Sequence, residues 1–159
     1  MKFLKTHYGR AIKVIPSDTV DIPNPAGLGK TGTATSGTDL TLEDSTANFT
    51  TNLFGAIVVN NTTGESANVV GLVDSTTLKL DAGIFAGGDL YSIYSSKNNE
   101  GCSLYIPAQT PGTLSIITIG GDYMILDGCG DLNSHTVLPI CVSRVLSGDT
   151  TLTNLVAIW

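Results

Sequence analysis

Short runs of apolar and β-branched residues recur about every ten residues along this sequence, and Gly, Asp, Asn or Thr separates each run from the next. That spacing is typical of antiparallel β-sandwiches and barrels. No stretch combines apolar residues at i, i+3, i+4 and i+7 with an absence of glycine and β-branched runs. The sequence therefore predicts an all-β fold, an antiparallel sandwich or barrel, in which no helix exceeds about two turns.

Two interruptions divide the strand pattern into three parts. Residues 16–29 contain three prolines and two glycines, and proline lacks the backbone donor that a sheet needs, so we expect an extended loop or linker there. Residues 95–100 are polar. The predicted organisation is an N-terminal strand and linker at 1–30, a small barrel-like β module inserted at 31–94, and an antiparallel sheet at 95–159 that packs with the N-terminal strand.

Individual strands follow from the same pattern. Residues 3–15 are expected to form one long or bent strand, and the module at 31–94 contains about five strand signals. Further along, Gly120-Gly121-Asp122 predicts a tight hairpin. A long strand is expected at 136–146, interrupted by Pro139 because proline cannot donate to the ladder.

The charge balance argues against nucleic acid as a direct partner. The net charge is −6 and only 14% of residues are charged, so phosphate would be repelled. Four of the eight basic residues lie near the N-terminus, where we interpret them as the solvated face of a strand. A weakly charged surface is tolerated when much of it meets neighbouring subunits. The basic group, including one histidine, is Lys2, Lys5, His7, Arg10 and Lys13.

The cysteine pattern does not predict disulfides or metal. Cys102, Cys129 and Cys141 are odd in number and widely spaced, so we expect free thiols in a reducing cytoplasm. With His7 and His135 as the only histidines, no four-ligand zinc site is expected. The sequence shows no signal peptide and no run of 18 apolar residues, so neither secretion nor a membrane partner is expected.

No pattern in the sequence predicts catalysis or a cofactor. His135 lies in a polar loop and no G-x-S-x-G motif occurs. The adjacent carboxylates Glu43 and Asp44 should point to opposite faces of a strand. The loop at 127–133 lacks the spacing of a calcium loop, and residues 27–32 do not match a phosphate loop. We therefore expect no enzymatic activity, no catalytic residue, no cofactor and no metal.

Two groups of strands and turns resemble parts of small, β-rich virion structural proteins of tailed bacteriophages, especially those of aquatic bacteria. The first resembles a β module that recurs in phage head and tail proteins, and the second resembles the closing strands of short proteins on capsids or tail attachments. Together they cover about half of the chain. The first group comprises 45–50, 58–63, 74–80 and 84–94; the second comprises 137–146, Thr150 and 155–159.

This resemblance implies a non-enzymatic capsid decoration, or cement, protein that bridges and stabilises major capsid subunits. Its location would be the virion, assembled in the host cytoplasm. An alternative is a tail, neck or baseplate component. An alternative of another class is a carbohydrate-binding module for host attachment, whose aromatic platforms would come from Tyr91, Tyr94, Tyr105 or Tyr123. Their strand positions favour core or interface roles instead.

The last strand signal supplies a candidate interface. Leu155, Ala157 and Trp159 should share one face, and Val156 and Ile158 the other, so both faces are apolar. The second face needs cover, either from the inserted module or from a neighbouring subunit. Our hypothesis is that this edge contributes to an interface, in a homo-oligomer with a trimer favoured, or with the major capsid protein or another virion protein.

Overall fold

The protein is described by a computed structural model, which covers residues 8–96 and 100–159. Two antiparallel sheets of six strands each form the fold. In the described residues the named helical elements are two three-residue 3₁₀ turns, η1 (Pro25–Gly27) and η2 (Thr51–Leu53). The prediction of an all-β chain without long helices is confirmed.

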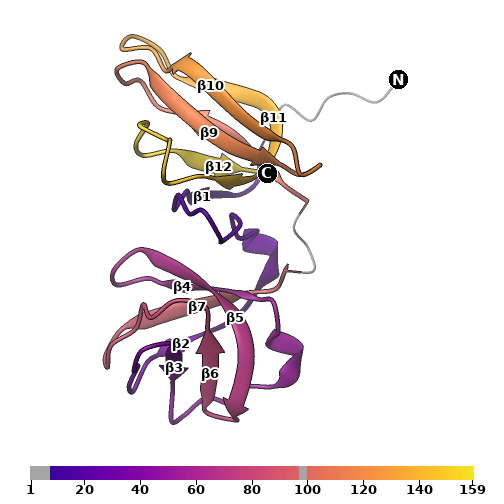
Figure 1. Cartoon of the computed structure of the whole chain (residues 1–159), viewed down its shortest axis with the longest axis vertical. Helices are drawn as coiled ribbons and strands as arrows, with labels where there is room; N and C mark the ends of the chain where they lie inside the picture. Colours follow the sequence, from indigo (N-terminus) through magenta and orange to yellow (C-terminus); the bar gives the residue numbers. More distant parts are fainter. Residues whose placement is uncertain (1–7, 97–99) are drawn as a thin grey trace. The chain divides into compact units, whose positions relative to one another are not determined.

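The chain divides into two compact units, each with its own sheet and core. Unit 1 comprises Met1–Pro25 and Glu100–Trp159, and unit 2 comprises Ala26–Asn99. Unit 2 is therefore inserted in sequence between the two parts of unit 1, as the colours of Figure 1 show. The range 31–94 lies inside unit 2.

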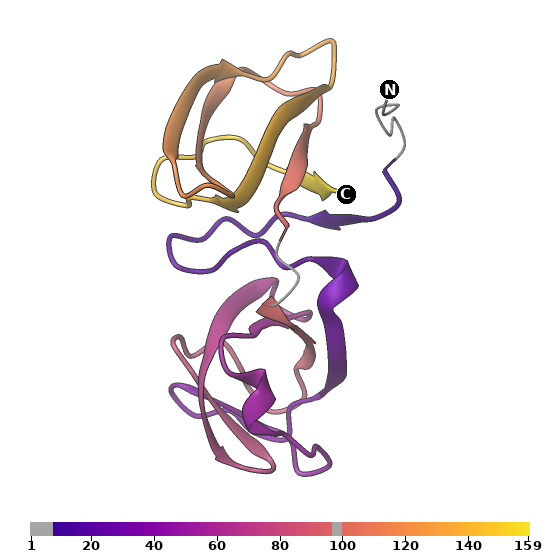
Figure 2. The same cartoon turned by 90° about the vertical axis from the view of Figure 1, so that its right-hand side faces the viewer.

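Unit 1 is an antiparallel sheet with strand order β1-β12-β8-β11-β9-β10. Strands β1 and β10 form its two edges, and Figure 2 shows the sheet curled around its own interior. The strands are β1 (Ala11–Lys13), β8 (Cys102–Ile106), β9 (Gly112–Thr118), β10 (Tyr123–Cys129), β11 (Thr136–Val145) and β12 (Val156–Ile158).

The first strand is shorter than the sequence predicts. A long strand was expected at 3–15, but β1 has only three residues, and positions 3–7 lie outside the described residues. Pro16 explains where the pairing stops, because it has no backbone donor. The next amide, that of Ser17, bonds instead to the Val145 carbonyl of β11 at 2.8 Å. The chain thus leaves β12 and crosses to another strand of the same unit.

The two local features predicted for this unit are present. Strands β9 and β10 form the tight hairpin, in which the Thr118 amide donates to the Asp122 carbonyl at 2.9 Å. Gly121 adopts a positive φ of 90° in the turn, a conformation that favours glycine. In β11, the register with β8 shifts between Leu138 and Val142, the stretch that contains Pro139 and its missing donor.

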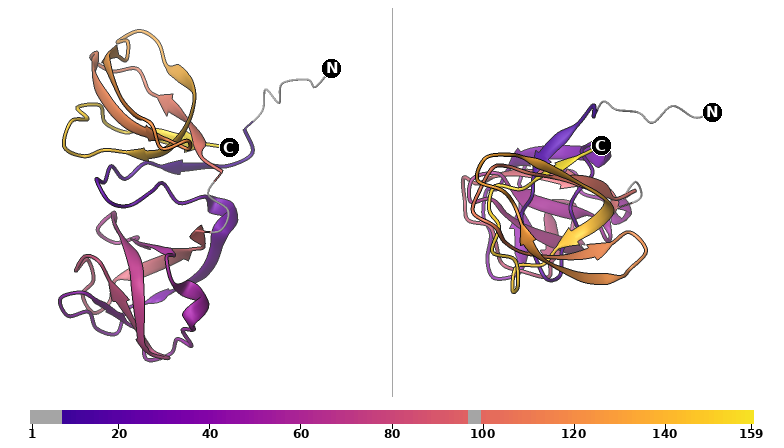
Figure 3. Two further views of the ribbon diagram at one scale, coloured as in Figure 1. Left: turned by 45° about the vertical axis from the view of Figure 1, so that its right-hand side comes forward. Right: turned by 90° about the horizontal axis from the view of Figure 1, so that it is seen from above.

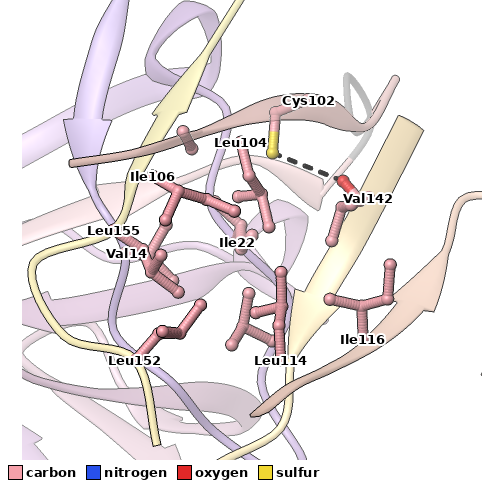
Figure 4. Close-up of a cluster of buried hydrophobic side chains, with 12 residues drawn as sticks. Val14, Ile22, Cys102, Leu104, Ile106, Leu114, Ile116, Val142, Leu152 and Leu155 are labelled. Atoms are coloured by element: carbon pink, nitrogen blue, oxygen red, sulfur yellow. Dashed lines mark hydrogen bonds between the residues drawn. The ribbon is translucent and has the colours of Figure 1, made fainter. Parts of the chain in front are cut away.

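The core of unit 1 is aliphatic. Alternate residues of its strands point into one cluster, which includes Leu104, Leu114 and Ile116, all 0% exposed. Figure 4 shows these side chains together with Val14 and the thiol of Cys102. That thiol donates to the Val142 carbonyl at 3.4 Å, which is the polar contact drawn in this interior.

Unit 2 has strand order β2-β7-β4-β5-β6-β3. The long strand β5 pairs through its first half with β4 and through its second half with β6, with register shifts in the second half. Such bulges bend a strand, and the sheet curls accordingly (Figure 3). The strands are β2 (Leu28–Thr33), β3 (Thr41–Glu43), β4 (Ile57–Asn60), β5 (Glu65–Asp74), β6 (Thr77–Leu80) and β7 (Leu90–Tyr94).

Strand β2 corrects the predicted loop at 16–29, because it begins at Leu28 and gives unit 2 six strands instead of about five. Its sequence, LGKTGT, has none of the apolar alternation by which strands are recognised. Pairing with β7 forms it: Thr31 lies opposite Ser92, and Leu28 lies opposite Tyr94. This last pair brings the two ends of unit 2 together.

Candidate interaction surface

The C-terminal strand does not lie at an edge. β12 is hydrogen-bonded on one side to β1 and on the other to β8; Val156, for example, is opposite both Lys13 and Tyr105. Its backbone groups are therefore used within unit 1 and cannot extend a partner's sheet. The final strand is therefore an inner strand of its sheet and not the edge that the interface hypothesis described, while the interface role itself stays a hypothesis. Strand order depends on pairing between distant segments, which local sequence does not contain.

The two faces of β12 separate as their alternation predicts. Leu155 and Ala157 are 2% and 0% exposed and belong to the core of unit 1, and Trp159 packs partly buried against the same cluster. Val156 and Ile158 are half-buried. Three of the five candidate interface residues thus face the core of their own unit. An interface role stays a hypothesis for Val156 and Ile158 alone.

Strand β10 is an edge strand whose second side carries no other strand of the sheet. The hairpin bond between Thr118 and Asp122 fixes which of its residues bond to β9. In an antiparallel ladder bonded and non-bonded pairs alternate, so Met124 and Leu126 direct their N–H and C=O groups toward β9. The same groups of Tyr123 and Ile125 point to the open side, and Asp127 lies where the register shifts.

The outer face of this hairpin is apolar and exposed. Tyr123 and Ile125 are 53% and 48% exposed, and Ile117 of β9 lies directly opposite Tyr123 on the same face. We call Ile117, Tyr123 and Ile125 the outer row. Met124 and Leu126 alternate to the other face, where they pack against the core of unit 1. One short hairpin thus combines an open backbone edge with an apolar face.

The other sheet edges are protected by devices that natural proteins use against unwanted pairing. β1 and β3 have only three residues each, and β1 ends on Lys13. β2 carries Lys30 between two glycines. β10 has seven residues and no lysine or proline, and its one charge, Asp127, lies next to the register shift that follows Leu126. Among the edges of the described residues, β10 is the least protected.

The residues considered for chemistry do not converge on a catalytic arrangement. The ring of His135 stacks on that of Tyr105, with the ring centroids 5.4 Å apart. Glu43 is half-exposed whereas Asp44 is buried, as expected for neighbours on a strand. Within residues 8–96 and 100–159, no group of three His, Cys, Asp or Glu side chains could hold a metal ion. The three cysteines are free.

Unit 2 contains a buried polar cluster that the sequence analysis missed. The Tyr91 hydroxyl donates to the Asp44 carboxylate at 2.7 Å, and both residues are almost fully buried. Burial by itself raises the pKa of Asp44, but hydrogen bonds from Tyr91 and Thr46 and the charge of Lys30 outweigh it and lower the pKa below its ordinary value of 3.8. Burial, and then Asp44, raise the pKa of Tyr91. The cluster holds β7 against the turn after β3.

A shallow pocket of about 300 Å³ lies in the same unit, lined by residues that include Lys30, Asn48, Asn52 and Phe54. The Lys30 ammonium donates to the Asn48 carbonyl at 2.9 Å, and the Phe54 ring is 53% exposed. An exposed ring beside amide groups has the chemistry of a saccharide platform. Of the tyrosines considered for that role, Tyr91 is 1% exposed and serves the core.

Comparisons with known proteins identify no relative of this chain. No family model, no curated protein and no solved structure matches the chain. Among the described residues, no helix is long and apolar enough to cross a membrane. The surface of the β9–β10 hairpin is therefore interpreted from its own geometry.

Proposed function

We propose that the chain is a non-enzymatic structural protein of a tailed-phage virion, acting as a capsid decoration protein that bridges and stabilises major capsid subunits. The observation that supports this most is the β9–β10 hairpin, which exposes the outer row and an unpaired backbone edge on one unit. Exposed apolar residues grouped on one face mark interaction sites. An open edge offers β-augmentation as the mode of attachment.

A capsid lattice can stabilise a small contact surface of this kind, because the same contact is repeated many times. One outer row gives a small contact, below the area of a stable two-protein interface. Repetition over a symmetric shell raises the effective concentration of each contact, so modest individual affinities suffice. The low charged fraction of 14% reduces the desolvation cost of covering the surface.

The test is a count of copies in purified virions by quantitative mass spectrometry against the major capsid protein. A decoration protein is present in hundreds of copies, whereas a neck or tail ring has on the order of a dozen. The copy number therefore also decides the alternative of a tail, neck or baseplate component. Absence from purified virions would overturn the proposal.

A matched pair of variants tests the surface itself. Ile125→Thr removes an exposed apolar residue of the outer row, and Val73→Thr does the same on β5 of unit 2, where Val73 is 61% exposed. We expect Ile125→Thr to lower incorporation into virions while Val73→Thr leaves it unchanged. Equal incorporation of both variants would remove the outer row from the proposal.

The pocket of unit 2 favours a second candidate function, glycan binding during host attachment. The exposed ring of Phe54 and the amide of Asn52 line the same cavity. A glycan array with the whole chain tests it, with Phe54→Ala as the loss variant and Leu90→Ala, also 53% exposed in the native chain, as control. Binding that survives Phe54→Ala would exclude this pocket as the site.

A further inference from the structure

We propose that two copies of this chain pair through strand β10, antiparallel and about a two-fold axis at Ile125, to form one continuous sheet. This names the partner at the open edge, and it rests on the proposed function only for its setting in a virion. The backbone edge of the hairpin would pair with the second copy, and the outer row of the same hairpin would contact a capsid subunit. The two contacts do not compete, because they lie in different directions. The edge lies in the plane of the sheet, whereas the outer row projects from its face.

The backbone of β10 has the correct phase for this pairing. Tyr123 and Ile125 direct their N–H and C=O groups to the open side, as the Thr118–Asp122 bond of the hairpin requires. In an antiparallel pair centred on Ile125, this residue exchanges two hydrogen bonds with its own copy. Tyr123 lies opposite Asp127 of the second copy, where the register of β10 with β9 shifts. The regular part of β10, residues 123–126, thus lies within the paired stretch.

Charge excludes one of the registers that the phase allows. Centred on Ile125, the pairing sets Asp127 opposite Tyr123 of the second copy, an acidic residue opposite a neutral one. Within its own chain the Asp127 carboxylate accepts from Thr113, and the Tyr123 hydroxyl donates to Asp149. The two Asp127 residues are then separated by four residues along the sheet, about 13 Å, beyond the screening length of about 8 Å in physiological salt. A register centred on Asp127 would set the two carboxylates directly opposite each other.

The pairing also identifies what the second copy contributes. Both outer rows come to lie on the same face of a sheet in the order β9-β10-β10-β9, with the two Ile125 side chains adjacent at the axis. The exposed apolar face is thereby doubled and becomes continuous. A capsid subunit would then contact one continuous apolar surface, of which each chain supplies half. The two-fold pair replaces the trimer that the sequence favoured.

A proline variant with a matched threonine control tests the edge in solution. Ile125→Pro removes the edge-facing donor without touching a bond to β9, whereas Ile125→Thr keeps the donor and changes only the side chain. Light scattering should give twice the chain mass of 16.5 kDa for the native protein and for Ile125→Thr, and a monomer for Ile125→Pro. A native monomer or trimer would overturn the inference, as would a dimer that survives Ile125→Pro with an intact fold.

Cysteine cross-linking tests the register and does not depend on folding of the proline variant. In a background with Cys129→Ser and Cys141→Ser, Ile125→Cys should form a symmetric disulfide, since bonded antiparallel pairs have Cα atoms about 5.5 Å apart. Tyr123→Cys alone should not cross-link, but its mixture with Asp127→Cys should. Cross-linking of Tyr123→Cys to itself, or failure of Ile125→Cys, would overturn the register. A dimer in solution together with absence from virions would overturn the proposed function alone.

Discussion

Units 1 and 2 contain the same number of antiparallel strands, and in the described residues each buries three polar side chains, but the units differ in how these groups are satisfied. In unit 2, Asn60 is 0% exposed, donates to the Ile84 carbonyl and to Asp89, and accepts from two backbone amides. Asp44 is held in the same interior by Tyr91. Unit 1 has an aliphatic core cluster, buries the Ser115 hydroxyl without a hydrogen-bond partner, and has an open sheet edge at β10.

The contrast teaches how similar sheets acquire different roles. A buried polar cluster in which every group is satisfied specifies one arrangement of the strands around it, and it suits a unit that must keep its shape. An unprotected edge carries a risk of pairing, and it is retained where pairing is useful. By this reasoning, unit 2 is a self-contained part, and the proposed assembly surface lies on unit 1.

The largest effects should come from cavities made separately in the two cores. Leu104→Ala in unit 1 and Leu78→Ala in unit 2 each truncate a side chain that is 0% exposed, at a cost of about 2–5 kcal/mol. Because each core is separate, hydrogen exchange should show lost protection mainly in the mutated unit. Equal loss in both units for either variant would show that they unfold as one.

Removal of Ile158 and Trp159 should have the next largest effect, again confined to unit 1. The backbone amide of Trp159 donates to Arg10, its carbonyl accepts from Gly9, and its ring packs on the core. We expect unit 1 to lose about 2–3 kcal/mol of unfolding free energy, measured by urea titration, while unit 2 is unchanged. A large fall in virion incorporation without a stability loss would instead support the interface role predicted for this strand.

A smaller effect should appear in acid, where Asp44 contributes to the stability of unit 2. The folded state lowers the pKa of Asp44 below 3.8, so it favours the carboxylate. That stabilisation is fully present above the ordinary pKa and is lost as the pH falls through the lower folded-state value. Melting curves of Asp44→Asn should lack this part of the acid dependence. Asp39→Asn, at an exposed position, should retain it; identical profiles for the two variants would contradict the prediction.

The smallest effect separates the three thiols by rate alone. Cys141 is exposed, Cys129 is half-buried and Cys102 is buried, and burial raises the pKa of Cys102 to about 12. Since the thiolate is the reactive form, a thiol reagent should modify Cys141 first, Cys129 slowly and Cys102 only after unfolding. A native protein that titrates fewer than three thiols even when denatured without reductant would reveal a disulfide.

The features that could be predicted from the sequence are those that depend on residues close together along the chain. The ten-residue rhythm predicted an all-β chain, Gly120-Gly121-Asp122 the hairpin, and Pro139 the interrupted ladder. β2 was missed because its LGKTGT sequence carries no alternation and becomes a strand only by pairing with β7. The interface was assigned to residues 155–159 because both faces of the final strand are apolar, and the open edge at β10 was missed because only long-range pairing decides which strand is covered.

The insertion of unit 2 also sets an order of events on the ribosome. All strands of unit 2 have been synthesised before β8 appears, so this unit can fold while unit 1 still lacks most of its sheet. β1 must wait for β12, its partner from the opposite end of the chain. A prematurely terminated chain would therefore carry a finished unit 2 beside an unfinished unit 1. Synthesis of β12 is thus what allows the sheet that carries the proposed assembly surface to close.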